Sequence, residues 1–260
     1  MAKDNGGDDV EEEEVAGDNE EVEIEPDDKE GSVVKQEVEA EPDTTRDQLR
    51  ELGFYDNEFS EFPPELSGVK RFKVEGNAEP LIEALQLTGL DITFMKKELV
   101  EALGRIGDPV AVDVLTDNLR GDLQMDVFDA LGRIGSAEAT EDVADFLDPE
   151  KKVKPHVRAK AAETIGKIED PEAIEVLAEA LEIENSRVRG AVAQAIGEIG
   201  GEDAPVNELA SLLDREDEYN TESVRLSAAR ALDRIGTDEA REALSDYRDD
   251  KNELVADVAG

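Results

Sequence analysis

The chain has 260 residues, with 69 acidic and 28 basic side chains, so its formal net charge is -41. It has no Cys and a single His, which excludes a disulfide framework, a Cys-based zinc site and a Cys nucleophile. The sequence contains no 18-residue apolar run and no apolar signal segment at its start, so we expect neither a membrane-spanning helix nor secretion. A charge this negative repels nucleic-acid phosphates and anionic membranes, and we expect neither as a partner.

Residues 1–43 are the most acidic part of the chain. They hold 19 acids and only three bases, a net of -16, and no aromatic residue. Such a composition cannot bury enough apolar surface to offset the ordering entropy, so we predict a disordered acidic tail. Two interpretations stay open: a solvating tail, or an arm that binds a basic partner.

Residues 44–77 form an aromatic segment. A short helix is expected over 44–52, followed by four of the ten aromatic residues of the chain and then two prolines. These aromatic residues are Phe54, Tyr55, Phe59 and Phe62. One interpretation is an N-terminal cap that covers the apolar end of a helical stack. The alternative is a segment that docks into another protein.

A repeat occupies residues 78–247. The segments ALGRIGDP, ALGRIGSA, TIGKIEDP, AIGEIGGE and ALDRIGTD begin at residues 102, 130, 164, 195 and 231. Their isoleucines, Ile106, Ile134, Ile168, Ile199 and Ile235, are 28, 34, 31 and 36 residues apart. Such spacings are typical of short helical hairpins with loops of variable length.

Each of these isoleucines ends an apolar ladder. The residues 11, 7 and 3 positions earlier are apolar in all five repeats, and these steps place them on one face of a helix. The columns are Met95, Leu123, Val157, Val188 and Val224; then Leu99, Val127, Ala161, Val192 and Ala228; then Leu103, Leu131, Ile165, Ile196 and Leu232. We call these the B helices.

A second helix set, the A helices, precedes the B helices. The segments expected are 80–87, 111–119, 139–147, 173–181, 205–213 and 239–247. Asp108-Pro109 and Asp170-Pro171 are start signals, because Asp caps free amides and Pro suits the first helical turn. Residues 248–260 then read as a polar C-terminal tail.

Glycine recurs inside four of the five B helices. Gly104, Gly132, Gly166 and Gly197 hold the same position, and the fifth repeat has Asp233 there. A helical Gly costs about 1 kcal/mol relative to Ala, so its recurrence predicts close approach of stacked helices. Asp233 fits a last full repeat with only half a neighbour.

The segments VRAKAAETIGKIEDPEA at 157–173 and VRGAVAQAIGEIG at 188–200 resemble HEAT-like repeats of the phycobilisome-lyase type. The resemblance covers about residues 78–247 and implies an all-α, right-handed α-solenoid of about five hairpins plus a terminal helix. It implies no single function, because this class includes scaffolds, bilin lyases and deoxyhypusine hydroxylase. The hydroxylase binds iron through His-Glu motifs, whereas His156 is the only His here, expected in a loop or first turn. We therefore expect no catalytic residue, cofactor or metal site.

Two basic features are candidates for partner binding. The first is a patch within residues 151–160: Lys151, Lys152, Lys154, His156, Arg158 and Lys160. The second is the column of Arg158, Arg189 and Arg225, each directly after the first ladder residue. The patch either offsets the acids of neighbouring repeats or anchors an acidic partner. The arginine column either pairs with Asp or Glu between repeats or forms a ligand-binding ridge.

The function expected from the sequence is a non-catalytic scaffold or adaptor that binds another protein of unknown identity. Abundant Asp and Glu, few Lys and few large aromatic residues resemble the composition of proteins from salt-accumulating haloarchaea, which indicates a high-salt cytoplasm. The alternative, a HEAT-repeat enzyme or enzyme subunit, is disfavoured by the single His. The sequence leaves the oligomeric state open.

Overall fold

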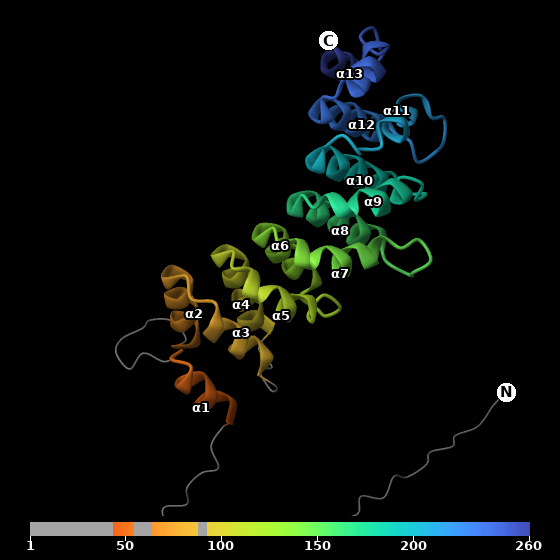
Figure 1. Cartoon of the computed structure of the whole chain (residues 1–260). Coiled ribbons are helices and arrows are strands. Elements are labelled where there is room, and N and C mark those ends of the chain that lie inside the picture. The colour runs from red at the N-terminus through yellow and green to blue at the C-terminus, as the bar shows by residue number, and fades with distance from the viewer. Residues whose placement is uncertain (1–43, 55–63, 88–92) are drawn as a thin grey trace, which may run out of the picture. The chain divides into compact units, whose positions relative to one another are not determined.

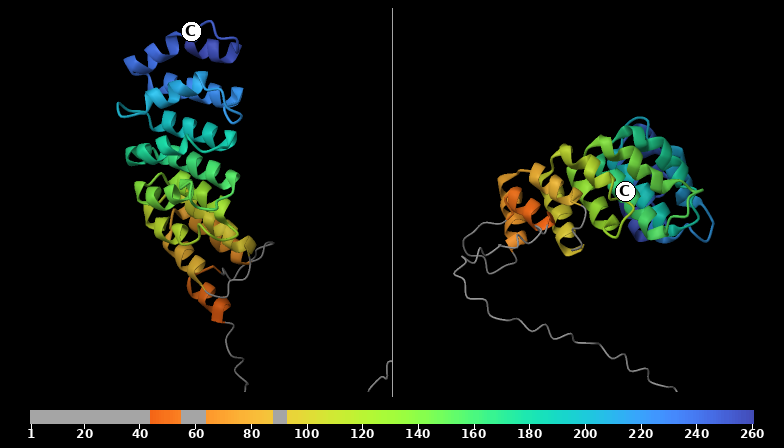
Figure 2. Two further views of the ribbon diagram at one scale, coloured as in Figure 1. Left: turned by 90° about the vertical axis from the view of Figure 1, so that its right-hand side faces the viewer. Right: turned by 90° about the horizontal axis from the view of Figure 1, so that it is seen from below.

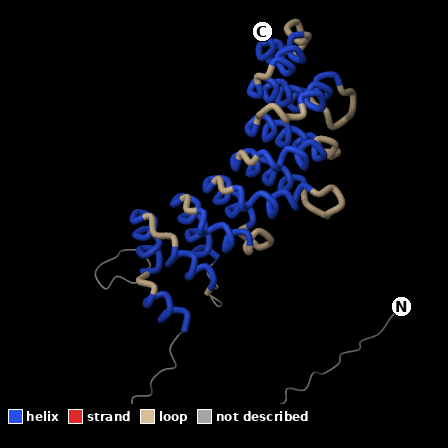
Figure 3. Tube along the Cα trace, viewed as in Figure 1, coloured by secondary structure: helices blue, strands red, loops and turns tan. Residues whose placement is uncertain are grey.

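The computed structural model describes residues 44–54, 64–87 and 93–260, in which every regular element is a helix (Figure 3). The compact unit that contains them spans residues 41–260. The acidic tail predicted for residues 1–43, and the aromatic residues Tyr55, Phe59 and Phe62, lie outside the described residues.

The helices form stacked hairpins, and each A helix packs on the B helix that follows it (Figure 1). The pairs are α3 (Glu79–Gln86) with α4 (Thr93–Ile106), α5 (Val112–Thr116) with α6 (Gln124–Ile134), α7 (Thr140–Ala144) with α8 (Pro155–Ile168), α9 (Ile174–Ala180) with α10 (Ser186–Ile199), α11 (Val206–Asp214) with α12 (Glu222–Ile235), and α13 (Asp238–Ser245) with α14 (Glu253–Ala259). Consecutive B helices contact one another from α4 to α14, and the pairs appear as layers in Figure 2. The predicted all-α solenoid is confirmed.

Several A helices are shorter than the sequence predicts, because they begin or end as 3-10 turns. The turns are η1 (Pro109–Ala111), η2 (Ala137–Ala139) and η4 (Pro171–Ala173) at the start, and η3 (Asp145–Leu147) at the end of α7. The side chains of Asp108 and Asp170 each accept a hydrogen bond at 3.0 Å from the amide two residues later. Both predicted start signals therefore cap a turn, although it is a 3-10 turn.

The apolar ladder of the B helices is the core of the stack. All fifteen residues of its first three columns are buried. In the last column Ile168 is buried, and the other four isoleucines are half-buried against the core. The periodicity therefore identified the buried face correctly in every repeat.

Three of the four helical glycines mark close contact between B helices. A Cβ on Gly104 would lie 2.6 Å from the Cα of Ala130, and a Cβ on Gly197 would lie 2.5 Å from the Cα of Ala231. Gly166 faces Ala195 in the same way, at 2.9 Å. A side chain at these positions would force the helices apart.

Gly132 is different, because Thr164 takes the place of the facing alanine. The Thr164 hydroxyl lies 2.9 Å from the Lys160 carbonyl of its own helix and 3.2 Å from the Phe128 carbonyl of α6, so its single proton is shared between the two and connects α8 to α6. A Cβ on Gly132 would lie 3.1 Å from the end of the flexible Lys167 side chain and 3.7 Å from the Thr164 methyl group, so it would meet side chains rather than the backbone of α8. The α6–α8 step is thus held partly by a side-chain hydrogen bond.

The stack continues at both ends beyond the five predicted hairpins. In place of the polar tail expected for residues 248–260, α14 packs on α12, with Val255 and Ala259 buried. Val255 and Ala259 are spaced like the first two ladder residues, a match too short to notice in the sequence. The fifth repeat therefore has a full neighbouring hairpin, and the expectation built on Asp233 was wrong.

At the other end, α2 (Pro64–Glu75) packs on α4, in the row of B helices. Phe54 follows α1 (Thr44–Glu51), is fully buried, and meets Phe72 of α2 edge to face, with ring centroids 5.2 Å apart. A Cβ on Gly68 would lie 2.5 Å from the Phe54 Cα, so α2 admits Phe54 only because residue 68 is Gly.

Candidate protein-binding surfaces

The structure divides the basic patch of residues 151–160 into paired and unpaired side chains. Lys151 pairs with Asp145 and Asp148. Lys160, half-buried, lies 2.6 Å from Asp129 of the preceding repeat. Lys152, Lys154 and His156 are exposed and form no ion pair among the described residues. His156 is the second residue of α8, in the first turn as expected.

Arg158 is buried, so its side chain is not available to a binding partner. Its guanidinium donates to the carbonyls of Leu147 and Lys151 at 2.8 and 2.6 Å, and to that of Pro149 at 3.4 Å. These carbonyls lie at the end of the A helix and in the loop that follows it. Arg158 therefore fixes the loop of its own hairpin.

Arg189 and Arg225 fix their own hairpin and also reach the next one. The Nε of Arg189 donates to the Leu181 carbonyl at 2.9 Å, and its terminal nitrogen lies 2.9 Å from both oxygens of Asp217. Arg225 repeats the arrangement, with 2.7 Å to the Leu213 carbonyl and 2.6 Å to Asp250. The interpretation of inter-repeat pairing is borne out by these geometries for both residues.

The acids in these pairs have lowered pKa values. Burial works to raise the pKa of Asp217, but hydrogen bonds from Arg189 and from the Tyr219 amide outweigh it and lower the pKa. The hydrogen bond from Arg225 lowers the pKa of Asp250. Both carboxylates therefore stay ionised and paired at neutral pH.

Arg215 extends the Asp217 pair into a network across two hairpins. Its guanidinium contacts Asp217 at 2.6 Å and Glu182 through two parallel hydrogen bonds of 2.8 and 2.9 Å. Such bidentate contacts are among the stronger polar interactions of proteins. Arg189 and Arg225 thus connect neighbouring repeats, Arg158 fixes its own hairpin, and the column does not form an exposed ridge.

Phe54 is also unavailable to a partner, because its side chain is fully buried. The docking interpretation of the aromatic segment is therefore wrong for this residue. The other three aromatic candidates fall in residues 55–63, outside the described residues.

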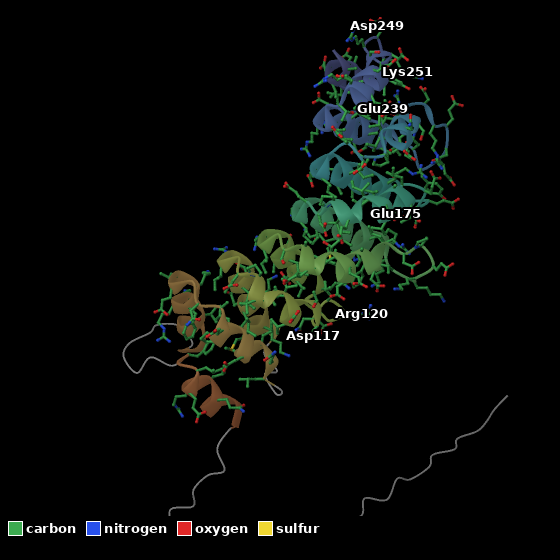
Figure 4. The ribbon with its side chains drawn as sticks, viewed as in Figure 1. Asp117, Arg120, Glu175, Glu239, Asp249 and Lys251 are labelled. Atoms are coloured by element: carbon green, nitrogen blue, oxygen red, sulfur yellow. The ribbon has the colours of Figure 1, made fainter. Side chains whose placement is uncertain are left out.

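The two helix rows carry opposite charge, a feature that the sequence analysis missed. The helices α3, α5, α7, α9, α11 and α13 contain twelve acids and one base, Arg241. The helices that follow them, α4, α6, α8, α10, α12 and α14, contain twelve bases and ten acids. Figure 4 labels two acids of the A helices, Glu175 of α9 and Glu239 of α13. It also labels Asp117, the residue directly after α5. The B helices are net positive in a chain of net charge -41.

Two positions on each B helix define what we call the polar B face. They lie six and ten residues after the first ladder residue, one turn apart on the same side of the helix. The earlier position is Glu101, Asp129, Glu163, Gln194 and Arg230, and the later is Arg105, Arg133, Lys167, Glu198 and Arg234. All ten side chains are exposed or half-buried.

Among the described residues, hollows between repeats include the following two. One, of about 290 Å³, lies between α7 with its following turn and α9, and its lining includes Asp145, Asp148, Val176 and Glu179. The other, of about 120 Å³, lies on the polar B face between α10 and α12. Its lining residues are Gln194, Ser227, Arg230, Ala231 and Arg234.

The described residues contain no group of three or more His, Cys, Asp or Glu side chains arranged to hold a metal ion. None of the described helices is both long and apolar enough to cross a membrane. The charged side chains are instead distributed in rows along the stacked helices.

Stacked helical hairpins with this ladder define an α-solenoid of the HEAT type. The family model of HEAT repeats matches residues 149–220 and 184–260, and that of the PBS lyase HEAT-like repeat matches residues 96–121. The chain is a HEAT-repeat protein. No curated protein matches the sequence.

Several solved structures resemble the fold. Human deoxyhypusine hydroxylase in complex with glycerol is 20% identical, with a TM-score of 0.37, covering 83% of this chain and 94% of its own. The complex of CpcE and CpcF of phycocyanin lyase from Nostoc sp. PCC7120 is 19% identical, with a TM-score of 0.45, covering 88% and 98%. An engineered protein is 22% identical, with a TM-score of 0.46, covering 70% and 93%.

Proposed function

We propose that this HEAT-repeat protein is a non-catalytic scaffold or adaptor that binds another protein through its polar B face, in the cytoplasm of a salt-accumulating organism. The observation that carries the proposal is the charge difference between the helix rows. The six A helices carry one base against twelve acids, whereas the six B helices that pair with them carry twelve bases and ten acids. Charged side chains that are exposed and regularly spaced along a row of helices can contact a partner protein at many points.

The arrangement of side chains also supports binding over catalysis. Cations that could have formed a compact site, such as Arg158 and Arg189, are committed to backbone carbonyls and to Asp217. The remaining exposed charges are spread from α4 to α12. Charges spread over a surface act on the choice of partner and the rate of association. Catalysis instead needs reactive groups that converge at one site.

Capture of partners at high salt tests the proposal. The full chain is compared with Arg133→Gln/Lys167→Gln on the polar B face and with Glu175→Gln/Glu208→Gln on the A helices. A partner retained by native protein and by the A-helix variant, but lost by the B-face variant, supports the proposal. If only the A-helix variant loses the partner, the assignment of binding to the polar B face is wrong. A chain lacking residues 1–43 measures what the acidic tail contributes.

A further inference from the structure

We propose that the hollow between α10 and α12 is a receptor for a side-chain carboxylate, so that the partner presents an acidic peptide segment there. The inference rests on the proposed function, because it specifies the chemistry of the partner. It is carried by Arg230 and Arg234, which line one side of the hollow, and by Gln194 across from them.

The charge pattern of the polar B face changes at this hollow. In α4, α6 and α8 an acid lies one turn before the base of the same helix, and Glu101 contacts Arg105 at 2.6 Å. In α12 the earlier position is Arg230, and the facing residue of α10 is the uncharged Gln194. The last of these B helices therefore has two cations at the positions where each of the first three has one acid and one base.

The hydrogen-bond donors around the hollow are incompletely used. Arg230 and Ser227 form no side-chain hydrogen bond or ion pair among the described residues, and Arg230 is exposed. Arg234 makes one long contact, 3.4 Å to Glu198, whose oxygen also accepts from Gln194 at 2.8 Å. A carboxylate accepts several hydrogen bonds, and two guanidinium groups with a nearby hydroxyl provide suitable donors for it.

Close helix packing shapes the hollow. Gly197 lets α10 approach Ala231, because a Cβ there would lie 2.5 Å from the Ala231 Cα. The small residues Ser227 and Ala231 then leave space between Gln194 and the two arginines. The volume of about 120 Å³ suits one side chain rather than a cofactor.

An acidic peptide fits this surface better than a nucleic acid does. Acids such as Glu163 and Glu198 alternate with the cations of the polar B face, and closely spaced phosphates would meet them. The net charge of -41 also opposes a polyanion at long range. An acidic peptide can place single carboxylates next to the cations of the polar B face and uncharged or basic residues next to its acids.

The test uses the full-length chain with fluorescein-labelled hexaglutamate as the probe and hexaglutamine as its uncharged counterpart. Binding is measured by fluorescence anisotropy at 0.15 and 0.5 M KCl, because at 0.5 M the Debye length is about 4 Å and the general repulsion is screened. The variant is Arg230→Gln/Arg234→Gln. The matched control is Arg187→Gln/Arg241→Gln, which removes the same charge from two exposed positions outside the polar B face.

We expect hexaglutamate to bind in preference to hexaglutamine, and the α12 variant to weaken binding by roughly tenfold or more. The control should change the Kd by about twofold or less. In NMR spectra of the full chain, the Nε–H signals of Arg230 and Arg234 should shift and saturate with hexaglutamate. Circular dichroism confirms that both variants keep their helicity.

Absence of hexaglutamate binding at both salt concentrations would overturn the carboxylate receptor. Equal weakening by the variant and the control would do the same, because it would show only a general charge effect. Tighter binding of a single-stranded oligonucleotide through Arg230 and Arg234 would overturn the choice of an acidic peptide. If the probe fails while Arg133→Gln/Lys167→Gln still loses the captured partner, this inference fails and the scaffold proposal stands.

Discussion

A terminal nitrogen of Arg189 lies 2.9 Å from both carboxylate oxygens of Asp217, although the two residues belong to different hairpins. The Arg189 side chain is 1% exposed, so the pair is screened little by solvent. The same guanidinium holds the Leu181 carbonyl at the end of α9. One side chain therefore connects its own hairpin to the next, at the level of the loops.

Arg189→Met should lower the free energy of unfolding by about 2–4 kcal/mol, because it removes the buried donor of the Leu181 carbonyl and one of the two arginines paired with Asp217. Arg187→Met, two residues earlier and exposed, should change it by about 0.5 kcal/mol or less. Urea unfolding followed by circular dichroism measures both. Equal effects of the two substitutions would show that the buried pair adds nothing.

The contribution of Asp217 should depend on pH in a defined direction. Its pKa is lowered in the folded chain, whereas an unfolded Asp titrates near 3.9. The stabilisation is therefore fully present above about pH 4 and is lost as the pH falls through the folded pKa. The difference in unfolding free energy between native protein and Asp217→Asn should shrink below pH 4. Glu216→Gln, a change at an exposed neighbour, should show no such trend.

Two glycines of α10 should respond oppositely to the same substitution. Gly197→Ala should destabilise by about 1–3 kcal/mol, because its Cβ would meet the Ala231 backbone at 2.5 Å. Gly190→Ala should stabilise by up to about 1 kcal/mol, because its nearest contact would be 3.6 Å and Ala favours a helix. Thermal unfolding measures both, and destabilisation by Gly190→Ala would contradict the packing described for this helix.

Glu169 is the one non-glycine residue with a positive φ, 58°, among the described residues. It ends α8 in the left-handed conformation that Gly135 and Gly236 adopt after α6 and α12. Glu169→Gly should therefore raise the unfolding free energy by about 0.5–1 kcal/mol. Glu169→Gln controls for the lost charge, and an equal gain there would assign the effect to charge rather than to the backbone.

Salt should stabilise the stack. Residues 44–260 carry a net -25, the chain total less the -16 of residues 1–43, and most acids of the A helices are exposed. At molar salt the Debye length falls to about 3 Å and repulsion between these acids is largely removed. We expect helicity to fall progressively on dilution from molar KCl, measured by circular dichroism. Full helicity with an unchanged melting temperature at 50 mM KCl would contradict the high-salt assignment.

The sequence by itself determined the repeating hairpins and the buried face of each B helix. These features are local: a 3.6-residue period fixes which side of a helix is apolar, and Val188, Val192 and Ile196 show it without any neighbour. The glycine column also predicted close helix contact, correctly for Gly104, Gly166 and Gly197.

Only the tertiary structure decided how the cations are used. Arg158 and Lys152 lie close together in the sequence, yet one is buried on carbonyls and the other is exposed, because burial depends on which side of the stack a residue faces. The partner of Arg189 is 28 residues away, a distance that no local pattern specifies. The hollow at Arg230 likewise exists only where α10 and α12 meet, since packing brings Gln194 across from the two arginines.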